Sequence, residues 1–386
     1  MDSQLQNSVE PTRQAFREQM PISRKWAYFD HAAVAPITEP AAAAMRLQVE
    51  QALEEGDTAW PAWARGLRET REAAAELIHA EPDEIALVPN TTAGINLVAE
   101  GLDWRAGDNV VTLADEYPSN LYPWMHLADR GVETRMVPTD NGRVDYDELA
   151  DHCDDRTRLI TVSWVAFSNG CRRDLKTIGE IAARREALLF VDAIQGLGAF
   201  PLDVRETPVD FLAADGHKWM LGPEGAGMAY IRKDRLPLLR AVGVGAHSVV
   251  HDQDYTHIEL RLKETADRYE GGSSNVPGML GFGASVRLLQ RLGVANIAAA
   301  ILELTDYLCE RLAALGLRVI SPRSGEERSG IVSFELPGAD VLAVRRHCLR
   351  QGVALACRAG RIRISPHGYN NHEDVERLIE ALRSFH

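Results

Sequence analysis

The sequence predicts an α/β protein with a mostly parallel sheet, covered by helices on both faces and followed by a smaller C-terminal α+β domain. Apolar runs between residues 84 and 233 alternate, for the most part, with helix-like patterns, which is typical of parallel sheets. The stretch at residues 271–283 is rich in glycine and serine, and the pattern changes after it. Hydrophobic residues make up 45% of the chain and charged residues 25%, as in ordinary globular domains.

The strands of the large sheet are expected at short runs rich in Val, Ile and Leu. These runs are residues 84–89, 109–114, 134–139, 158–166, 187–194, 211–215 and 227–233. Helices are expected where apolar residues recur at helical spacing, at residues 92–102, 121–131, 146–153 and 177–187. Ligands of parallel sheets bind beyond the carboxyl ends of the strands, so the residues there are our candidates for a site.

The second domain mixes helices with shorter strands. Its expected helices are residues 284–293, 297–316, 340–352 and 373–385, and its expected strands are 318–322, 330–337, 353–357 and 361–366. A chain of 386 residues is long enough for two or three domains. We therefore divide it into an N-terminal segment (1–30), a large domain (31–280) and a small domain (281–386).

Composition disfavours several classes of protein. The formal net charge of −14 would repel nucleic acids and anionic membranes. No apolar run is long enough to cross a bilayer, and the polar first residues do not resemble a signal peptide. The five cysteines are scattered and lack C-x-x-C spacing, as in reduced cytoplasmic proteins. We expect a cytoplasmic protein with no nucleic-acid or membrane partner.

Two charged residues follow apolar strands closely. In "LLFVDAIQGLG", Asp192 ends a strand, where a buried carboxylate needs a cationic partner; a helix cap is the simpler interpretation. In "DGHKWMLGPEG", Lys218 lies near apolar residues, which lower the pKa of a lysine and make its amine a nucleophile toward carbonyls. The simpler interpretation there is a surface lysine beside a core histidine, His217.

Two further strand ends offer an anion site and a flat ring. "VPNTTAGINLVAEG" leads from a strand into a helix that Asn90 or Thr91 would cap. The free N–H groups at Thr92, Ala93 and Gly94 would bind an anion, although an ordinary cap explains the pattern as well. Tyr117 follows another strand. An anion site, a ring, a buried acid and a reactive amine together match pyridoxal phosphate (PLP).

The chain resembles the class V aminotransferase and cysteine desulfurase family of fold-type I PLP-dependent enzymes. The resemblance extends from "YFDHAAVAP" at residues 28–36 to "RIRISPHGYNNHEDVERLIEAL" at residues 361–382. Its most specific parts are "VDAIQ" and "DGHKWMLGPEG". It implies the fold-type I architecture and a PLP cofactor.

The resemblance also implies how the cofactor ring is held. Lys218 would form the Schiff base and then act as the base at the substrate Cα. Asp192 would pair with the pyridinium nitrogen, Gln195 would hydrogen-bond the ring oxygen, and Tyr117 would stack on the ring. We assign catalytic roles to Lys218, Asp192 and Tyr117.

The phosphate would be held by Thr92, the backbone at Ala93, and His217. In "RYEGGSSN", Ser273 occupies the position of a hydroxyl residue that reaches the phosphate of the neighbouring subunit. The resemblance therefore implies a homodimer with shared active sites.

The same resemblance implies an amino-acid substrate. Arg363 matches the arginine that binds the α-carboxylate, a role that suits its planar guanidinium. Asp30 and His31 lie where the N-terminal segment of the family lines the substrate pocket.

The sequence departs from the desulfurases at several positions. Cys357 lies in a short apolar run, so we interpret it as a small buried hydrophobe and not as a sulfur acceptor. Asp215 replaces a serine near the phosphate and is expected to turn away or to pair with a cation. The polar partner near residues 163–169 stays open between Ser163, Ser168 and Asn169.

We expect a cysteine desulfurase-like or C–S lyase reaction. The alternatives are a class V aminotransferase, an amino-acid epimerase resembling isopenicillin N epimerase, and a non-catalytic interaction protein that keeps the fold. No metal is expected, because the residues His247, His251, Asp252 and His257 fit no known ligand spacing.

Overall fold

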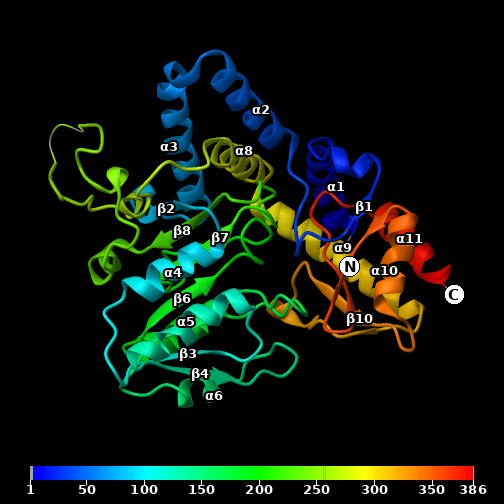
Figure 1. Cartoon of the computed structure of the whole chain (residues 1–386). Helices are drawn as coiled ribbons and strands as arrows, with labels where there is room; N and C mark the ends of the chain where they lie inside the picture. Colours follow the sequence, from blue (N-terminus) through cyan, green and yellow to red (C-terminus); the bar gives the residue numbers. More distant parts are fainter. Residues whose placement is uncertain (1–2, 255, 257, 386) are drawn as a thin grey trace.

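The computed structural model describes residues 3–254, 256 and 258–385. It consists of a large unit built on a seven-stranded sheet and a smaller unit beside it (Figure 1). The strands of the large sheet lie in the order β2-β8-β7-β6-β5-β3-β4. Their bounds are β2 (Ile85–Val88), β3 (Asn109–Leu113), β4 (Glu133–Val137), β5 (Thr157–Ser163), β6 (Leu188–Asp192), β7 (Phe211–Asp215) and β8 (Gly227–Ile231).

The strands β3 to β7 pair in parallel, whereas β8 runs antiparallel to both β2 and β7. The predicted mostly parallel sheet is therefore confirmed. Successive side chains of a strand point to opposite faces, and both faces are covered. On β7, Phe211 and Ala213 pack into one core cluster, while Leu212 and Ala214 pack into the other.

Different helices cover the two faces. Helices α4 (Thr91–Gly101) and α5 (Tyr122–His126) supply apolar residues to one cluster. Helices α3 (Trp60–Leu77), α6 (Tyr146–Asp151), α7 (Leu175–Arg184) and α8 (Val276–Leu292) supply the other. Helix α2 (Glu39–Glu54) packs with α3 against α8 at the top of Figure 1. Helices α2 and α3 were not predicted from the sequence.

The smaller unit is an antiparallel sheet covered by helices. Its strand order is β12-β13-β10-β9. The strands are β9 (Arg318–Val319), β10 (Val332–Glu335), β12 (Ala356–Arg358) and β13 (Arg361–Ile364). The helices are α9 (Val294–Ala314), α10 (Val341–Arg350) and α11 (His372–Arg383). In Figure 1, α9 crosses from the large unit into the small one.

The N-terminal segment packs largely with the small unit. Helix α1 (Ser3–Glu18) lies against α9, and β1 (Ala27–Tyr28) pairs in parallel with β11 (Val353–Ala354). The chain then crosses toward the carboxyl ends of β6 and β7, so that the loop after β1 lies between the two units. The domain limits at residues 30 and 280 stay a prediction.

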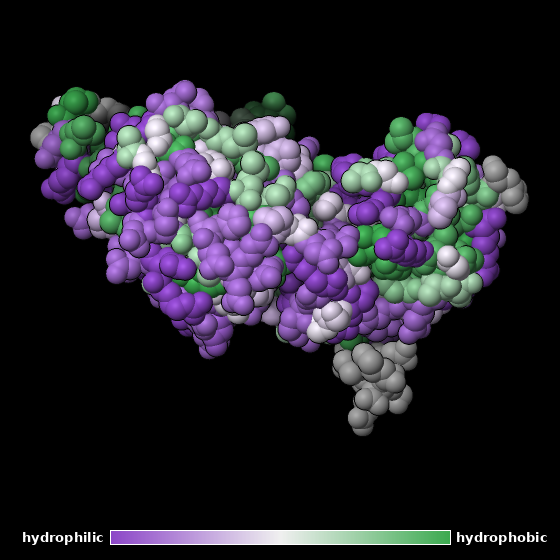
Figure 2. All heavy atoms as spheres, turned by 90° about the horizontal axis from the view of Figure 1, so that it is seen from below, coloured by the Kyte–Doolittle hydropathy of each residue, from purple (hydrophilic) through white to green (hydrophobic). Residues whose placement is uncertain are grey.

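The surface carries scattered apolar side chains among polar ones, as Figure 2 shows for the lower face. Within the described residues, no single helix is long and apolar enough to span a membrane; α8 and α9 meet that test only as a pair bent by 79°.

Candidate active site

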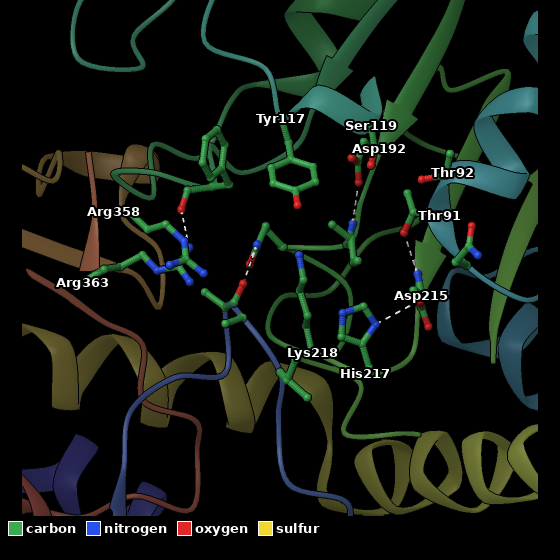
Figure 3. A pocket seen from close by; sticks show the side chains of 17 residues that line it. Thr91, Thr92, Tyr117, Ser119, Asp192, Asp215, His217, Lys218, Arg358 and Arg363 are labelled. Atoms are coloured by element: carbon green, nitrogen blue, oxygen red, sulfur yellow. Dashed lines mark hydrogen bonds and ion pairs between the residues drawn. The ribbon is translucent and has the colours of Figure 1, made fainter. Parts of the chain in front are cut away.

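The loop after β7 places Lys218. Gly216 has no room for a side chain, because a Cβ there would lie 2.7 Å from the carbonyl oxygen of Ala226 and 2.7 Å from Cδ2 of Phe282. The loop then turns tightly, with the Leu221 N–H donating to the Lys218 carbonyl at 3.1 Å. Leu221 adopts a φ of +54°, a left-handed conformation that costs energy for a branched residue. The folded loop directs Lys218 into the cavity and toward Tyr117 (Figure 3).

Burial makes the protonated amine of Lys218 lose its proton more easily than that of an ordinary lysine. Removal from water lowers the pKa of Lys218 to about 8, against the opposing attraction of Asp192. Nζ lies 5.6 Å from the centroid of the Tyr117 ring. A sizeable fraction of such amines is neutral near physiological pH, and a neutral amine can attack an aldehyde.

Asp192 faces the same pocket from the end of β6. Its Oδ1 accepts the N–H of Ile194 at 3.0 Å, so the loop after the strand orients the carboxylate. Burial raises the pKa of Asp192 to about 6, and the nearby Glu116 carboxylate also raises it. A buried carboxylate of this kind needs a cation, which a protonated ring nitrogen would supply.

Lys218 and Asp192 meet in one cavity of about 360 Å³. The predicted residues that line it are Thr92, Tyr117, Asp192, Gln195, His217, Lys218 and Arg363. Lining residues that the sequence analysis did not assign to the site include Ser119, Phe167, Arg358 and the loop of Ala32–Val34. Ser119 lies two positions beyond Tyr117 in the chain.

One side of the cavity is suited to an anion. Asn90 caps α4, its side chain accepting the N–H of Ala93 at 2.8 Å. The Ala93 N–H is therefore already engaged, and Ala93 does not line the cavity. Thr92 does line it, at the start of the helix, where the free N–H groups and the helix dipole favour negative charge.

Asp215 lies beside His217 on the same side. Its Oδ2 is 3.0 Å from Nδ1 of His217, and its backbone N–H donates to Oγ1 of Thr91 at 3.0 Å. Asp215 thus lies within ion-pair distance of the histidine, but the contact is not a hydrogen bond among the described residues, so the pairing of Asp215 with a cation stays a prediction. With Nδ1 turned toward Asp215, the other ring nitrogen of His217 is left to serve a ligand.

The opposite side of the cavity carries Arg363, which projects from β13 and is 1% exposed. Nη1 donates to the Phe167 carbonyl at 2.7 Å, and Nη2 lies 3.6 Å from Oδ1 of Asp30. Within the described part of the chain, Nε and Nη2 have no hydrogen-bond partner. Burial lowers the pKa of Arg363 to about 10, with Asp30 opposing the shift. Unpaired donors of a buried guanidinium suit a carboxylate ligand.

His31 is placed differently from our expectation. It does not line the cavity, because its ring is completely buried between the Ser365 carbonyl, at 2.7 Å from Nδ1, and the Tyr369 hydroxyl, at 2.8 Å from Nε2. Burial holds the pKa of His31 well below its usual value. His31 is thus a neutral core residue, and the loop that follows it supplies the lining instead.

Asp30 also stays outside the lining, but it contacts Arg363 from behind. Burial raises the pKa of Asp30, and Arg363 opposes that shift. Ser273 is exposed and does not line the cavity of its own chain, so its role across a subunit interface stays a prediction.

None of the three polar candidates, Ser163 at the end of β5 and Ser168 and Asn169 in the segment after it, lines the cavity. Ser163 hydrogen-bonds the buried Glu116 through its N–H and its hydroxyl, and Asn169 donates to the Asn141 carbonyl. Phe167, between Ser163 and Asn169, is the residue that reaches the cavity. Its ring meets that of Tyr117 edge to face, at 5.2 Å between centroids.

Cys357 is half-buried, and its thiol donates to the Val341 carbonyl at 3.1 Å. Burial raises the pKa of this thiol, which makes it a poor nucleophile. In the described part of the chain, no group of three His, Cys, Asp or Glu side chains could hold a metal ion. His257 lies outside the described residues, so the absence of a metal stays a prediction.

The side chains that line the cavity provide the groups that pyridoxal phosphate needs. It offers an amine of lowered pKa, a helix start for the phosphate, and a buried carboxylate that accepts no hydrogen bond from a cation among the described residues. The donors of Arg363 that have no hydrogen-bond partner in the described part of the chain would remain for the carboxylate of an amino acid.

Comparison with known proteins supports this interpretation. A sequence model of the family "Aminotransferase class-V" matches residues 27–378. A probable cysteine desulfurase of Methanothermobacter thermautotrophicus is 32% identical, over 95% of this chain and 96% of the relative.

Two solved structures of the enzyme C-DES are each 26% identical to this chain. A C-DES mutant with glycine covalently linked to its PLP cofactor has a TM-score of 0.90, over 96% of this chain and 99% of that one. A complex of the cystine C–S lyase C-DES with its reaction product cysteine persulfide has a TM-score of 0.89, over 95% and 100%. These likenesses confirm the expected architecture of the fold. The chain therefore belongs to the class V aminotransferase family.

Proposed function

We propose that this protein is a PLP-dependent enzyme that cleaves the carbon–sulfur bond of a cysteine-type amino acid. The observation that carries the proposal is the meeting of Lys218 and Asp192 in one cavity, with Arg363 on its opposite side. The relatives named as a cysteine desulfurase and as a cystine C–S lyase support the choice of a sulfur-containing substrate.

When bound, pyridoxal phosphate supplies an aldehyde for amines and a ring that takes up electrons from the substrate Cα. Lys218, with a pKa of about 8, is partly neutral near pH 7 and can take the proton from Cα. Asp192 can hold a proton on the ring nitrogen, because a cation beside it relieves the cost of its buried charge.

Arg363 orients the substrate by its α-carboxylate. Within the described residues, Nε and Nη2 have no hydrogen-bond partner, although Nη2 also lies 3.6 Å from Asp30. The two nitrogens can form a paired hydrogen bond with that carboxylate. Its remaining nitrogen, Nη1, is fixed by the Phe167 carbonyl, so the guanidinium does not have to be ordered on binding.

The positions of the cysteines favour release of sulfur over its transfer to the enzyme. None of the five cysteines, all of which lie within the described residues, lines the cavity. Loss of the Cα proton to Lys218 and of the sulfur group from Cβ would leave an unsaturated amino acid that hydrolyses to pyruvate and ammonia. Transfer of sulfur to an acceptor thiol would leave alanine instead.

We also propose a homodimer that acts in the cytoplasm. The exposure of Ser273, outside the cavity of its own chain, suits contact with a second copy. The free cysteines suit a reducing compartment. Light scattering during size-exclusion chromatography should give twice the chain mass of 42.6 kDa, and a monomer at micromolar concentration would contradict the dimer.

A panel of amino acids tests the reaction. PLP-loaded protein is incubated with cysteine, cystine and sulfur-free amino acids, and sulfide, persulfide, pyruvate, alanine and D-enantiomers are measured. Pyruvate from cysteine or cystine supports the lyase proposal. A keto acid that retains the side chain identifies an aminotransferase, and a D-enantiomer identifies an epimerase. Failure of the purified protein to gain a visible absorbance band with PLP would favour the non-catalytic interaction protein.

A further inference from the structure

Trp219 follows Lys218 directly but points away from the cavity into the core. It is 1% exposed, and its Nε1–H donates to Oε1 of Gln195 at 2.9 Å. Gln195 itself lines the cavity. The indole of the residue after the lysine is therefore linked to the ligand pocket by a hydrogen bond to the side chain of Gln195.

The amide of Gln195 is oriented from two sides. Its Nε2 donates to the Ala32 carbonyl at 3.0 Å, while Oε1 accepts from Trp219. A flipped amide would face its oxygen toward the Ala32 carbonyl and its NH₂ toward the indole N–H, so both contacts would be lost. One hydrogen of Nε2 is used by Ala32, and the second is left for a ligand.

Trp219 is itself held rigidly. A Cβ on Gly330 would lie 2.4 Å from Cη2 of the indole, and one on Gly198 would lie 2.3 Å from the Trp219 carbonyl oxygen. The absence of side chains at both glycines gives the tryptophan its space. His367 adds a contact from the small unit, with Nε2 at 2.9 Å from the same carbonyl oxygen and its ring 5.6 Å from the indole.

We propose that Trp219 is a positioning residue: through Gln195 it fixes an N–H donor for the ring oxygen of bound pyridoxal phosphate. The inference rests on the proposed function, since the acceptor belongs to that cofactor. A donated N–H stabilises the negatively charged form of the ring oxygen. Loss of the donor should therefore make the chromophore at Lys218 hold its proton up to a higher pH.

The Trp219 substitution leaves in place the other charged and titratable groups near the ring oxygen of the cofactor. They are Asp30, Tyr117, Asp192, Asp215, His217, Lys218, Arg358 and Arg363.

The experiment is a pH titration of the visible absorbance of the PLP-loaded protein. For Trp219→Phe we expect the midpoint to rise by about 0.5–1 unit, as for loss of one hydrogen bond. The matched control is Trp124→Phe, because Trp124 is equally buried and its Nε1–H donates to the side-chain oxygen of Asn120 at 3.1 Å. The control should leave the midpoint within about 0.2 unit, well below one hydrogen bond.

A second background tests whether Trp219 acts through Gln195. In Gln195→Met protein, which has no amide, adding Trp219→Phe should move the midpoint by less than about a third of its effect in the wild type. An equal shift in both backgrounds would overturn the proposal, because Trp219 would then act through general packing. An unchanged midpoint for Trp219→Phe would overturn it as well.

A shape-preserving variant covers the case in which Trp219→Phe does not fold. Replacing Trp219 by benzothienylalanine exchanges the indole N–H for sulfur and keeps the ring size. The same rise of the midpoint is expected, and no rise would contradict the proposal. If wild-type protein gains no visible band with PLP, the proposed function fails. If the wild type titrates normally and the variants match it, only the role of Trp219 fails.

Discussion

The two sides of the cavity are built in different ways. On the cofactor side, Asp192 and Lys218 each lie within three residues of the end of a buried strand, and neighbouring backbone groups fix them. On the substrate side, Arg363 depends on Phe167 and Asp30, which are far away in the chain. The cofactor side is formed by residues at the ends of neighbouring strands of one sheet. The substrate side forms only when the small unit packs against the large one.

The two sides also differ in the charge that burial disfavours. Burial raises the pKa of Asp192 to about 6 and lowers that of Arg363 to about 10, so each group is costly in its charged form. Asp192 keeps a backbone donor, whereas two nitrogens of Arg363 have no hydrogen-bond partner in the described part of the chain, and one of them, Nη2, has only the ion pair with Asp30 at 3.6 Å. Changes on the cofactor side should therefore impair chemistry, and changes on the substrate side should impair binding.

The largest effect is expected for Lys218→Ala. The variant loses both the amine that captures the cofactor and the base at Cα, so turnover should fall by about 10³-fold or more. Pyruvate formation from cysteine or cystine measures it, with Lys176→Ala, an exposed lysine of α7, as the control. Turnover near the wild-type value would show that Lys218 is not the reactive amine.

Asp192→Asn should keep the shape of the cofactor side but not its charge. A neutral amide cannot hold the ring nitrogen protonated, so kcat should fall by about 10²-fold while KM changes little. Steady-state kinetics on PLP-saturated protein separates the two constants. A change in KM with kcat unchanged would place Asp192 on the substrate side and contradict the difference between the two sides.

Arg363→Ala should have the opposite signature. KM should rise by about 10- to 100-fold, as for loss of a paired hydrogen bond to a carboxylate, with the affinity for PLP unchanged. The matched control is Arg361→Ala on the same strand, since Arg361 lies 3.5 Å from Glu335 and does not line the cavity. Equal effects of the two substitutions would argue against a specific carboxylate site.

The lowered pKa of Lys218 predicts how cofactor uptake depends on pH. The group loses its proton near pH 8 in the fold, and only the neutral amine attacks an aldehyde. The rate at which protein stripped of cofactor gains visible absorbance with PLP should rise by about tenfold per unit below pH 8 and level off above it. A rate that falls as the pH rises toward 8 would contradict this pKa.

The smallest effect is expected for Cys357→Ser. The thiol is half-buried, bonded to a carbonyl and outside the cavity, so pyruvate formation should stay within about twofold of the wild type. A loss of more than tenfold would instead support a sulfur-accepting role for Cys357 and a desulfurase reaction.

The sequence predicted the cofactor side better than the substrate side for a physical reason. The strand ends at Asp192 and Lys218 follow from apolar runs, and parallel strands bring such ends together without further information. The place of His31 could not be predicted in this way. It depends on the pairing of β1 with β11 and on contacts with Ser365 and Tyr369, more than 300 residues away in the chain.

The sequence predicted the phosphate side only in part. A helix start was predicted from "PNTTAG", and α4 begins there. Which N–H groups stay free depends on the rotamer of Asn90, which engages Ala93. Helices α2 and α3 were not predicted. The buried residues of α2 are Ala41 and Gln48, which do not form the apolar stripe typical of a helix that faces a core.

Reduction with borohydride tests the central claim most directly. PLP-loaded protein is treated with borohydride, digested and mapped by mass spectrometry. The account predicts one pyridoxyl group, on the peptide that carries Lys218, and none in protein reduced before PLP is added. A pyridoxyl group on a different lysine, or no modified peptide from protein that has gained the visible band, would contradict it.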